Sequence, residues 1–372
     1  MGRNVTAGFG ASLALAACLT VSAAAIDATQ AQSRVVNVYN WSDYIDPDVL
    51  AAFTAETGIR VVYDTYDNNE IVETRLLAGR SGYDIVVPSG PFTQRLAAAG
   101  IFQEIDRSQI PNIVHAWPQI EERLAVYDPG NRFAVNYMWG TTGIGVNVAM
   151  VRERLGGEIP DSWDLVFDPE VASRLADCGI YVLDSAEDMF PTALNYLGLY
   201  PDSRDQGELQ QAADLLTRAA ANVRRFHSSE YINALATGDI CLAVGYSGDI
   251  LQARDRAEEA GSGIEIAYIV PEEGAQIWFD SFSIPADAEN VAEAHAFIDF
   301  MMRPEIAAQN VNYVNYASGN LAAKEFIDPA ILADPGIYPD DDTMERLFTN
   351  TAYDERTQRF VTRAWTRIRT GR

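Results

Sequence analysis

Three segments near the start of the chain decide the fold: RVVNVYN (Arg34–Asn40), DPDVLAAFTAET (Asp46–Thr57) and YDIVVP (Tyr83–Pro88). The first and last are rich in β-branched residues, which is typical of strands. The middle segment has Pro47 at its first helical position and Gly58 just past its end, which indicates a helix. Strands that alternate with helices in this way predict a parallel sheet covered by helices.

The alternation continues along the chain. A strand is expected at 59–63 and a helix at 69–79, and a second unit begins near Gly140. Later strands are expected at 180–183, 240–246, 263–270 and 276–285, and later helices at 186–196, 209–221, 292–302 and 355–369. A chain of 372 residues exceeds one ordinary core. The predicted fold class is therefore α/β, with two lobes that are each a mainly parallel sheet flanked by helices.

The polypeptide is expected to cross between the two lobes several times, because no Gly/Ser-rich linker separates the two units. The expected crossings are Met138–Thr142, Ala260–Gly263 and Arg303–Pro304. Lobe 1 is expected to comprise residues 34–139 plus about 261–303, and lobe 2 residues 140–260 plus about 304–372.

Residues 1–31 are interpreted as a secretory signal peptide. Arg3 precedes an Ala/Leu/Val-rich stretch, and cleavage is expected after Ala25 or Ala31. The stretch is too rich in small and polar residues for a typical membrane anchor. Leu15-Ala16-Ala17-Cys18 also resembles a bacterial lipobox, which would make Cys18 a lipidated N-terminus; the alternative is a small apolar residue in a discarded peptide. A periplasmic location is predicted.

The formal net charge of the chain is −26, and its carboxylates are spread along the sequence. Such a field repels nucleic acid and attracts cations, although it is also typical of a well-solvated surface. No nucleic-acid partner is therefore expected. Past the signal there are two cysteines, Cys178 and Cys241, which in an exported chain suggest one disulfide; two buried free thiols are the alternative.

Aromatic and acidic residues recur together where the expected strands end, which is where open α/β sheets bind ligands. The residues concerned are Trp41, Ser42, Asp43 and Tyr44, then Ser89, Asp188, Tyr246 and Asp249, and finally Trp278 and Asp280. An alkyl diamine needs carboxylates at its ammonium groups and flat apolar walls along its methylenes. The pattern therefore indicates a binding site for a small organic cation between the lobes.

Each of these residues also has a structural interpretation. Trp41, Trp278 and Tyr316 are candidates for interior packing, and Asp43 for a turn before the following helix. Asp188 lies three residues after Ser185 and is a candidate for a capping box, and Asp249 for a helix N-cap.

Several longer motifs resemble the periplasmic polyamine-binding proteins of bacterial ABC importers, and most closely their putrescine-binding branch. They include NWSDYI (Asn40–Ile45), YDIVVPS (Tyr83–Ser89), YMWGTTGIG (Tyr137–Gly145), FHSSEYIN (Phe226–Asn233) and GDIC (Gly238–Cys241). The resemblance implies a two-lobed fold that closes on its ligand, a Cys178–Cys241 disulfide, and importer membrane subunits as partners of a monomer. The same resemblance implies an aromatic box formed by Trp41, Tyr44, Trp278 and Tyr316. It implies that Asp249 and Asp280 are the main anchors for the ligand and that Asp188 contacts its far end. Further polar contacts would come from Ser42, Asp43 and Ser89.

The chain departs from the branch at the pocket. Tyr246 stands where Trp is expected, Asp188 replaces a longer Glu, and Gly90-Pro91 replaces a Ser-containing stretch. These changes leave room for a longer amine. Putrescine is the first expected ligand, with spermidine, cadaverine or agmatine, or a solute of another class, as alternatives.

An enzyme is not expected. Three histidines are present, and none forms an H-x-x-x-H zinc pair. Gly245–Gly248 resembles a nucleophile elbow, but Asp249 occupies the position that requires Gly. Asp249 and Asp280 could serve a glycoside hydrolase as a carboxylate pair. We expect no catalytic residues, no metal and no cofactor, and a receptor for amino acids is disfavoured because no arginine adjoins the strand-end residues.

Overall fold

The computed structural model describes residues 34–371, so the expected signal peptide and Cys18 lie outside the described residues. Within that range no helix has both the length and the apolar character needed to cross a membrane.

The first sheet is parallel, with strand order β2-β1-β3, and confirms the strand and helix alternation expected from the opening segments. Asp46 caps the first helix by accepting a hydrogen bond from Asp48 N, and Gly58 ends it with a φ of 69° that favours glycine. Its elements are β1 (Val35–Trp41), α1 (Pro47–Thr57), β2 (Arg60–Tyr66), α2 (Asn69–Leu77), β3 (Ile85–Val86) and α3 (Gly90–Ala98).

The second sheet is built around one long strand that sequence analysis did not identify, β4 (Val135–Asn147), which is buried throughout. The sheet has the order β10-β4-β7-β5-β6, and β8 and β9 also pair with β4. β4 runs antiparallel to its partners, whereas β5 is parallel to β6 and β7. The other strands are β5 (Ile180–Val182), β6 (Val223–Phe226), β7 (Leu242–Tyr246), β8 (Ile266–Ile269), β9 (Gln276–Phe282) and β10 (Ala317–Ser318).

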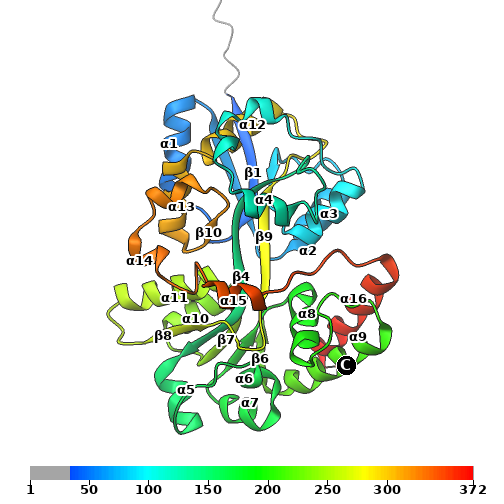
Figure 1. The fold of residues 1–372 in the computed structure, drawn as a ribbon, viewed down its shortest axis with the longest axis vertical. Helices are drawn as coiled ribbons and strands as arrows, with labels where there is room; N and C mark the ends of the chain where they lie inside the picture. The colour runs from blue at the N-terminus through cyan, green and yellow to red at the C-terminus, as the bar shows by residue number, and fades with distance from the viewer. Residues whose placement is uncertain (1–33, 372) are drawn as a thin grey trace, which may run out of the picture. The chain divides into compact units, whose positions relative to one another are not determined.

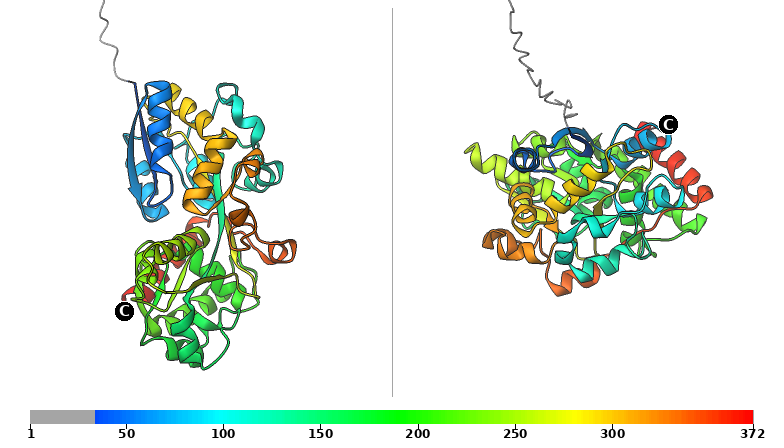
Figure 2. Two further views of the ribbon diagram at one scale, coloured as in Figure 1. Left: turned by 90° about the vertical axis from the view of Figure 1, so that its left-hand side faces the viewer. Right: turned by 90° about the horizontal axis from the view of Figure 1, so that it is seen from above.

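Helices flank both sheets (Figures 1 and 2). The remaining α-helices are α4 (Pro118–Leu124), α5 (Val148–Leu155), α6 (Asp164–Phe167), α7 (Pro169–Leu175), α8 (Ala186–Tyr196), α9 (Gln206–Ala219), α10 (Tyr231–Ala236), α11 (Ser247–Glu259), α12 (Val291–Met301), α13 (Pro304–Val314), α14 (Pro329–Leu332), α15 (Asp341–Arg346) and α16 (Glu355–Thr370). Short 3-10 helices are η1 (Arg107–Gln109), η2 (Pro111–His115), η3 (Ala220–Asn222) and η4 (Ala322–Glu325).

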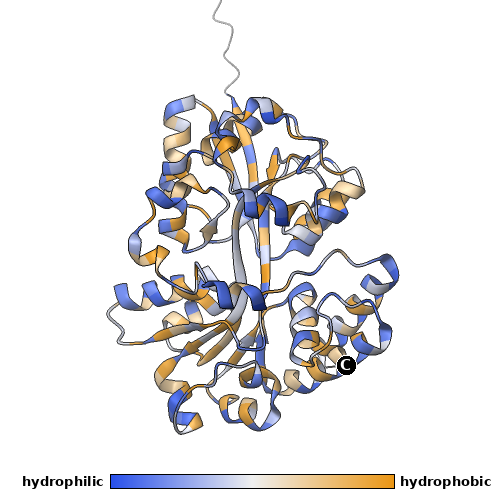
Figure 3. Cartoon of the chain, in the orientation of Figure 1, coloured by the Kyte–Doolittle hydropathy of each residue, from blue (hydrophilic) through white to orange (hydrophobic). Residues whose placement is uncertain are grey.

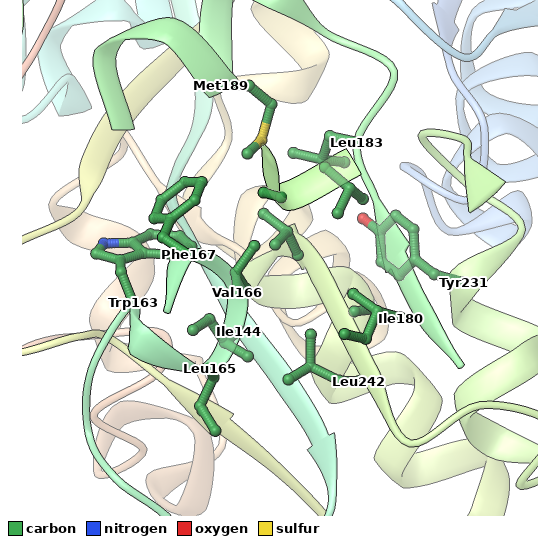
Figure 4. Packing of buried hydrophobic residues seen from close by; sticks show 14 of the residues in the cluster. Ile144, Trp163, Leu165, Val166, Phe167, Ile180, Leu183, Met189, Tyr231 and Leu242 are labelled. Carbon is green, nitrogen blue, oxygen red and sulfur yellow. The ribbon is translucent and has the colours of Figure 1, made fainter. Parts of the chain in front are cut away.

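Each sheet has its own hydrophobic core. One core surrounds β1 and includes Val38 and Phe297, and the other surrounds β5 and β7 and includes Trp163 and Tyr231. Figure 4 shows Trp163 and Tyr231 at opposite sides of the second core. In Figure 3 the central strand β4 is mostly of intermediate hydropathy, while α15 with its DDTMER sequence is mostly blue. The predicted Cys178–Cys241 disulfide is confirmed, and it lies within the second core.

The chain passes between the cores at places that differ from two of the expected crossings. β4 and β9 pair along their length and run from one core to the other (Figure 1). Ala257 and Ile266 both pack in the second core, so Ala260–Gly263 is a turn and not a crossing. Val314 packs in the first core, because α13 continues the packing of α12 beyond Pro304. We propose that lobe 1 is residues 34–138 plus about 279–334, and lobe 2 residues 140–277 plus about 348–372.

Candidate functional site

One cavity contains most of the strand-end residues identified from the sequence, and its walls come from both cores. Ten of the predicted binding residues line it: Trp41, Ser42, Tyr44, Ser89, Asp188, Tyr246, Asp249, Trp278, Asp280 and Tyr316. The topology explains this gathering. Trp41 ends β1, Tyr246 ends β7 and Trp278 lies in β9.

Three buried aspartates from different elements face this cavity. Asp280 on β9 accepts a hydrogen bond from Ser89 Oγ at 2.6 Å. Asp249 in the first turn of α11 accepts from the hydroxyls of Tyr231 and Tyr316, both at 2.6 Å. Among the described residues, none of the three aspartates forms an ion pair with an arginine, lysine or histidine. Their charge is therefore met only by neutral donors.

Asp188 is the third of these aspartates and lies in the first turn of α8. Its carboxylate accepts from Thr142 Oγ1 at 3.1 Å and from the hydroxyl of Tyr246 at 3.2 Å. Ser185 makes no side-chain cap bond to this helix, so the alternative of a capping box is not supported. Asp249 likewise lies inside the first turn of its helix, whose N-cap is Tyr246.

Burial shifts the ionisation of all three carboxyls. The pKa of Asp280 is raised to about 7, mainly by desolvation. The hydrogen bond from Ser89 lowers this pKa, and the charges of the other two aspartates raise it. Burial likewise raises the pKa of Asp249 to about 6 against the opposing hydrogen bonds from two tyrosines. The pKa of Asp188 is raised by burial too. The site therefore holds negative charge that a bound cation would stabilise.

Aromatic rings wall the cavity between the carboxylates. Ring centroids lie 6.3 Å apart for Trp41 and Tyr246, 5.6 Å for Tyr246 and Trp278, and 5.3 Å for Trp278 and Tyr316. Tyr316 and Trp278 also pack in the first core, so the two residues both line the cavity and take part in interior packing. These walls depend on glycine: a Cβ at Gly140 would lie 2.7 Å from the Trp278 ring, and one at Gly248 would lie 2.6 Å from Tyr316. Neither position can carry a side chain without moving a wall of the cavity.

Asp43 is the one predicted binding residue that the cavity does not contain. Its side chain is exposed and pairs with Arg256 at 2.7 Å. A φ of 53° places Asp43 in a turn that directs its carboxylate away from the cavity. The structural alternative, a turn residue before the following helix, describes this position.

Sequence analysis missed further residues that line the cavity. Glu187 is the neighbour of Asp188 on α8, and Gln276 lies two residues before Trp278 on the same face of β9, so position alone could have indicated them. The others are Tyr66, Asp67, Asn69, Phe92, Tyr127, Ser228, Ser229 and Asn350, and Pro91, which sequence analysis placed beside the pocket, also lines the cavity. Asn350 follows no strand or helix motif, and only the tertiary structure brings it to the site.

The described residues contain no group of three His, Cys, Asp or Glu side chains placed to hold a metal ion. The chemistry available in the cavity is therefore acceptance of hydrogen bonds by carboxylates, flanked by aromatic faces.

The site geometry agrees with the similarity of the chain to known proteins. It is 48% identical over 365 residues to the putrescine-binding periplasmic protein SpuD of Pseudomonas aeruginosa, covering 98% of this chain and 99% of that protein. It is 45% identical over 352 residues to the putrescine-binding periplasmic protein PotF of Escherichia coli, covering 94% and 95%. The resemblance noted in the sequence is thereby confirmed.

A solved structure supports the fold. The spermidine/putrescine ABC transporter substrate-binding protein PotD of Streptococcus pneumoniae superposes with a TM-score of 0.74 at 32% identity, covering 91% of this chain and 99% of that one. The predicted two-lobed α/β fold is confirmed. Residues 48–339 also match the family model described as bacterial extracellular solute-binding protein. The chain therefore belongs to the bacterial extracellular solute-binding proteins.

Proposed function

We propose that the chain is a periplasmic receptor that captures a polyamine, putrescine first, and delivers it to an ABC importer. The observation that carries the proposal is the set of Asp188, Asp249 and Asp280, buried around one cavity without a cationic partner among residues 34–371. Buried carboxylates without a counter-ion cost several kcal/mol each in stability. A ligand that carries the missing positive charges offsets this cost.

The aromatic walls suit the rest of such a ligand. Trp41 and Trp278 line the cavity, and aromatic ring faces attract both methylene groups and cations. No arginine, lysine or histidine lines the cavity within the described residues. A receptor for an anion or an amino acid would need one of these cations, so an aliphatic amine fits better than those solutes.

Binding would also hold the two lobes together. Ser89 on α3 and Trp41 on β1 come from the first lobe, and Asp188 on α8 and Asp249 on α11 come from the second. A diammonium ligand between them interacts with both sets only when the lobes are closed. Its binding therefore favours the closed state by the difference in affinity between the two forms.

The preference among polyamines depends on Asp188 and Tyr246. Tyr246 donates its hydroxyl to Asp188, so the shorter carboxylate and the smaller ring act as a pair. This pair leaves room for a longer amine, so cadaverine, agmatine and spermidine are the alternatives, and putrescine stays the first choice on the similarity to putrescine-binding relatives. Two of the curated relatives are named for putrescine, and a third is named a putrescine/agmatine-binding protein.

The protein acts in this proposal as a monomeric carrier without catalysis. Asp249 and Asp280 could otherwise form the acid and base pair of a glycoside hydrolase. Release of nitrophenol from chromogenic glycosides and esters by the purified protein would contradict the proposal. A sensory role would need a membrane receptor as partner in place of the importer.

Isothermal titration tests the function directly. The protein is unfolded to remove bound amine, refolded, and titrated with putrescine, cadaverine, agmatine and spermidine. One-to-one binding of at least one amine with a Kd near or below the micromolar range is expected, which corresponds to about 8 kcal/mol. Absence of heat and of thermal stabilisation with all four amines would refute polyamine capture.

A further inference from the structure

The last helix of the chain, α16, carries positive charge in a strongly acidic protein. It contains five arginines and one glutamate, which give a formal charge of +4, whereas the whole chain carries −26. One side of α16, with Val361 and Trp365, packs in the second core, and the helix lies beside α9 (Figure 1). All five arginines are exposed. The positive charge is therefore accessible to a partner.

Three of these arginines lie on one side of the helix. Arg359, Arg363 and Arg367 follow one another at intervals of one helical turn, and like charges at this spacing destabilise a helix. Glu355 pairs with Arg359 at 3.1 Å. Arg363 and Arg367 form no ion pair among the described residues, although the chain contains 53 acidic residues. The helix therefore carries an unfavourable charge pattern that its own chain does not neutralise.

Arg367 lines a groove of about 800 Å³ between α16, α9 and β6. Three further arginines line this groove, and Asp214 is the only carboxylate among the described residues that line it. Asp214 accepts a hydrogen bond from Gln210 Nε2 at 2.8 Å. Small side chains leave room for the main chain of a peptide. The alanines of the lining are Ala213, Ala220, Ala221 and Ala364, and its other arginines are Arg224, Arg225 and Arg369.

Arg224 is held in place without being neutralised. Its guanidinium donates to the backbone oxygens of Asp177 at 2.7 Å and Asp239 at 3.1 Å, and it forms no ion pair among residues 34–371. Arg224 and Arg367 are therefore available to carboxylates of a partner, each of which a guanidinium can bind through two parallel hydrogen bonds. The other two arginines of the groove are paired, Arg225 with Glu230 and Arg369 with Asp184.

The strand in this groove is an edge strand. β6 pairs with β5 and, within the described part of the chain, with no other strand, and all four of its residues line the groove. The free edge of such a strand presents backbone N–H and C=O groups that can pair with another chain. Extended peptides bind many proteins in this way, by adding a strand to a sheet. The groove thus offers backbone pairing and positive charge side by side.

We propose that this groove binds an extended acidic segment of a partner protein, which adds a strand to β6 and places carboxylates at Arg224 and Arg367. Successive side chains of an added strand point to opposite sides, so carboxylates on alternate residues lie along one side and small residues along the other. An anionic membrane fits the groove less well, because a lipid surface offers no backbone to pair with β6. The inference is independent of polyamine capture, since neither arginine lines the cavity between the lobes.

The probe is a dye-labelled peptide of about ten residues that alternates glutamate and alanine. Its binding to the protein is measured by fluorescence anisotropy at about 20 mM and about 200 mM salt, because salt screens charge attraction. The same peptide with every backbone nitrogen methylated keeps its carboxylates but donates no backbone hydrogen bond. It therefore separates strand addition from attraction between charges alone.

The protein variant is the double substitution Arg363→Glu and Arg367→Glu. Both side chains are exposed and unpaired within the described residues, so the variant should fold, which thermal unfolding checks. The matched control is Arg60→Glu with Arg152→Glu, on β2 and α5. These arginines are also exposed, do not line the groove, and change the net charge of the protein by the same amount.

We expect the wild-type protein to bind the glutamate–alanine peptide, more weakly at the higher salt concentration. The α16 variant should lower the affinity about tenfold or more, and the control pair should change it less than about twofold. The methylated peptide should bind about tenfold more weakly than the parent. No binding by wild-type protein, equal losses in the two double variants, or equal binding of the methylated peptide would overturn the proposal. Binding to phosphatidylglycerol vesicles but not to the peptide would also overturn it, and would assign this face to a membrane surface.

Discussion

Two buried aspartates show how differently this molecule uses the same side chain. Asp84, in the YDIVVP segment beside β3, accepts from Asn37 N and Nδ2, from Glu289 N, and from Asn290 N and Nδ2. The Asp280 carboxylate, on β9, accepts a hydrogen bond from Ser89 Oγ. Both are almost fully buried, at 1% and 4% exposure. Donors from elsewhere in the protein saturate the acceptor oxygens of Asp84 but not those of Asp280.

We use this difference to distinguish structural carboxylates from candidate binding carboxylates. Asp84 accepts hydrogen bonds from β1 and from the start of α12. Because these donors are far apart in sequence, Asp84 stabilises the tertiary structure of the first lobe. Asp280 has free acceptor capacity directed into a cavity that no cationic side chain lines among the described residues. Burial alone does not mark a binding residue. A buried charge that the fold leaves under-compensated does.

The largest expected effect is that of replacing Asp84 on the free energy of unfolding. Asp84→Asn should lower the free energy of unfolding by about 3 kcal/mol, because an amide nitrogen replaces an acceptor that faces several N–H donors. Urea unfolding of the ligand-free protein measures this. Amine affinity of the folded fraction should stay unchanged, and a selective loss of affinity would erase the distinction between the two aspartates.

Asp280→Asn is the matched substitution in the cavity. It should weaken putrescine binding by about 2 kcal/mol, roughly 30-fold, because one ammonium group loses its charged partner. Stability of the ligand-free protein should be unchanged or higher at pH 8, since a buried uncompensated charge is removed. Titration calorimetry and urea unfolding on one preparation give both numbers. A variant that binds normally would show that Asp280 is not an anchor.

The cavity aspartates Asp280 and Asp249 should make both stability and binding depend on pH. The ligand-free pKa values of about 7 for Asp280 and about 6 for Asp249 lie above the value of about 3.9 in unfolded chains. Their contribution to stability is therefore present below about pH 4 and is lost as pH rises through 6 to 7. Amine affinity should change in the opposite direction, rising from pH 5 to 8 by up to about tenfold per unit for each carboxyl that must ionise.

Titrations between pH 5 and 8 in buffers of different ionisation enthalpy measure both the affinity and the protons released. Asp280→Asn should flatten the upper part of the profile, and Asp84→Asn should leave its shape unchanged. A flat wild-type profile would mean that the cavity carboxyls are already ionised at pH 5.

The smallest expected effect concerns a residue behind the cavity wall. Tyr231 donates to Asp249 Oδ2 at 2.6 Å, accepts from Tyr246 N at 3.1 Å and does not line the cavity, so it acts through these two residues. Tyr231→Phe should weaken binding about fivefold at pH 7 through loss of about 1 kcal/mol of hydrogen bonding, and affinity should recover towards pH 9. Tyr353→Phe is the control, because the Tyr353 hydroxyl is buried without a partner. Equal losses in both variants would indicate a packing effect.

Much of the fold was predictable because local rules and tertiary packing agree. Proline and glycine limits placed α1, and the helix expected at 186–196 coincides with α8. β4 was missed because its 13 residues are all buried and contain three glycines, so no alternation marks them as a strand. Its glycines are explained by close neighbours: a Cβ at Gly143 would lie 2.5 Å from Ile269 O, and one at Gly145 2.4 Å from Ile250.

The sequence by itself determined the residue types of the cavity, because aromatic and acidic side chains follow strands whose ends meet at one edge of a sheet. Only the tertiary structure decided which carboxylates lack partners. Asp43 and Asp280 are both binding candidates in the sequence, yet Arg256 pairs with the first while no cationic side chain pairs with the second among residues 34–371. Glu187, Gln276 and Asn350 likewise meet through contacts that span up to 163 positions. Long-range packing sets the electrostatic surroundings of a side chain, and those surroundings determine its function.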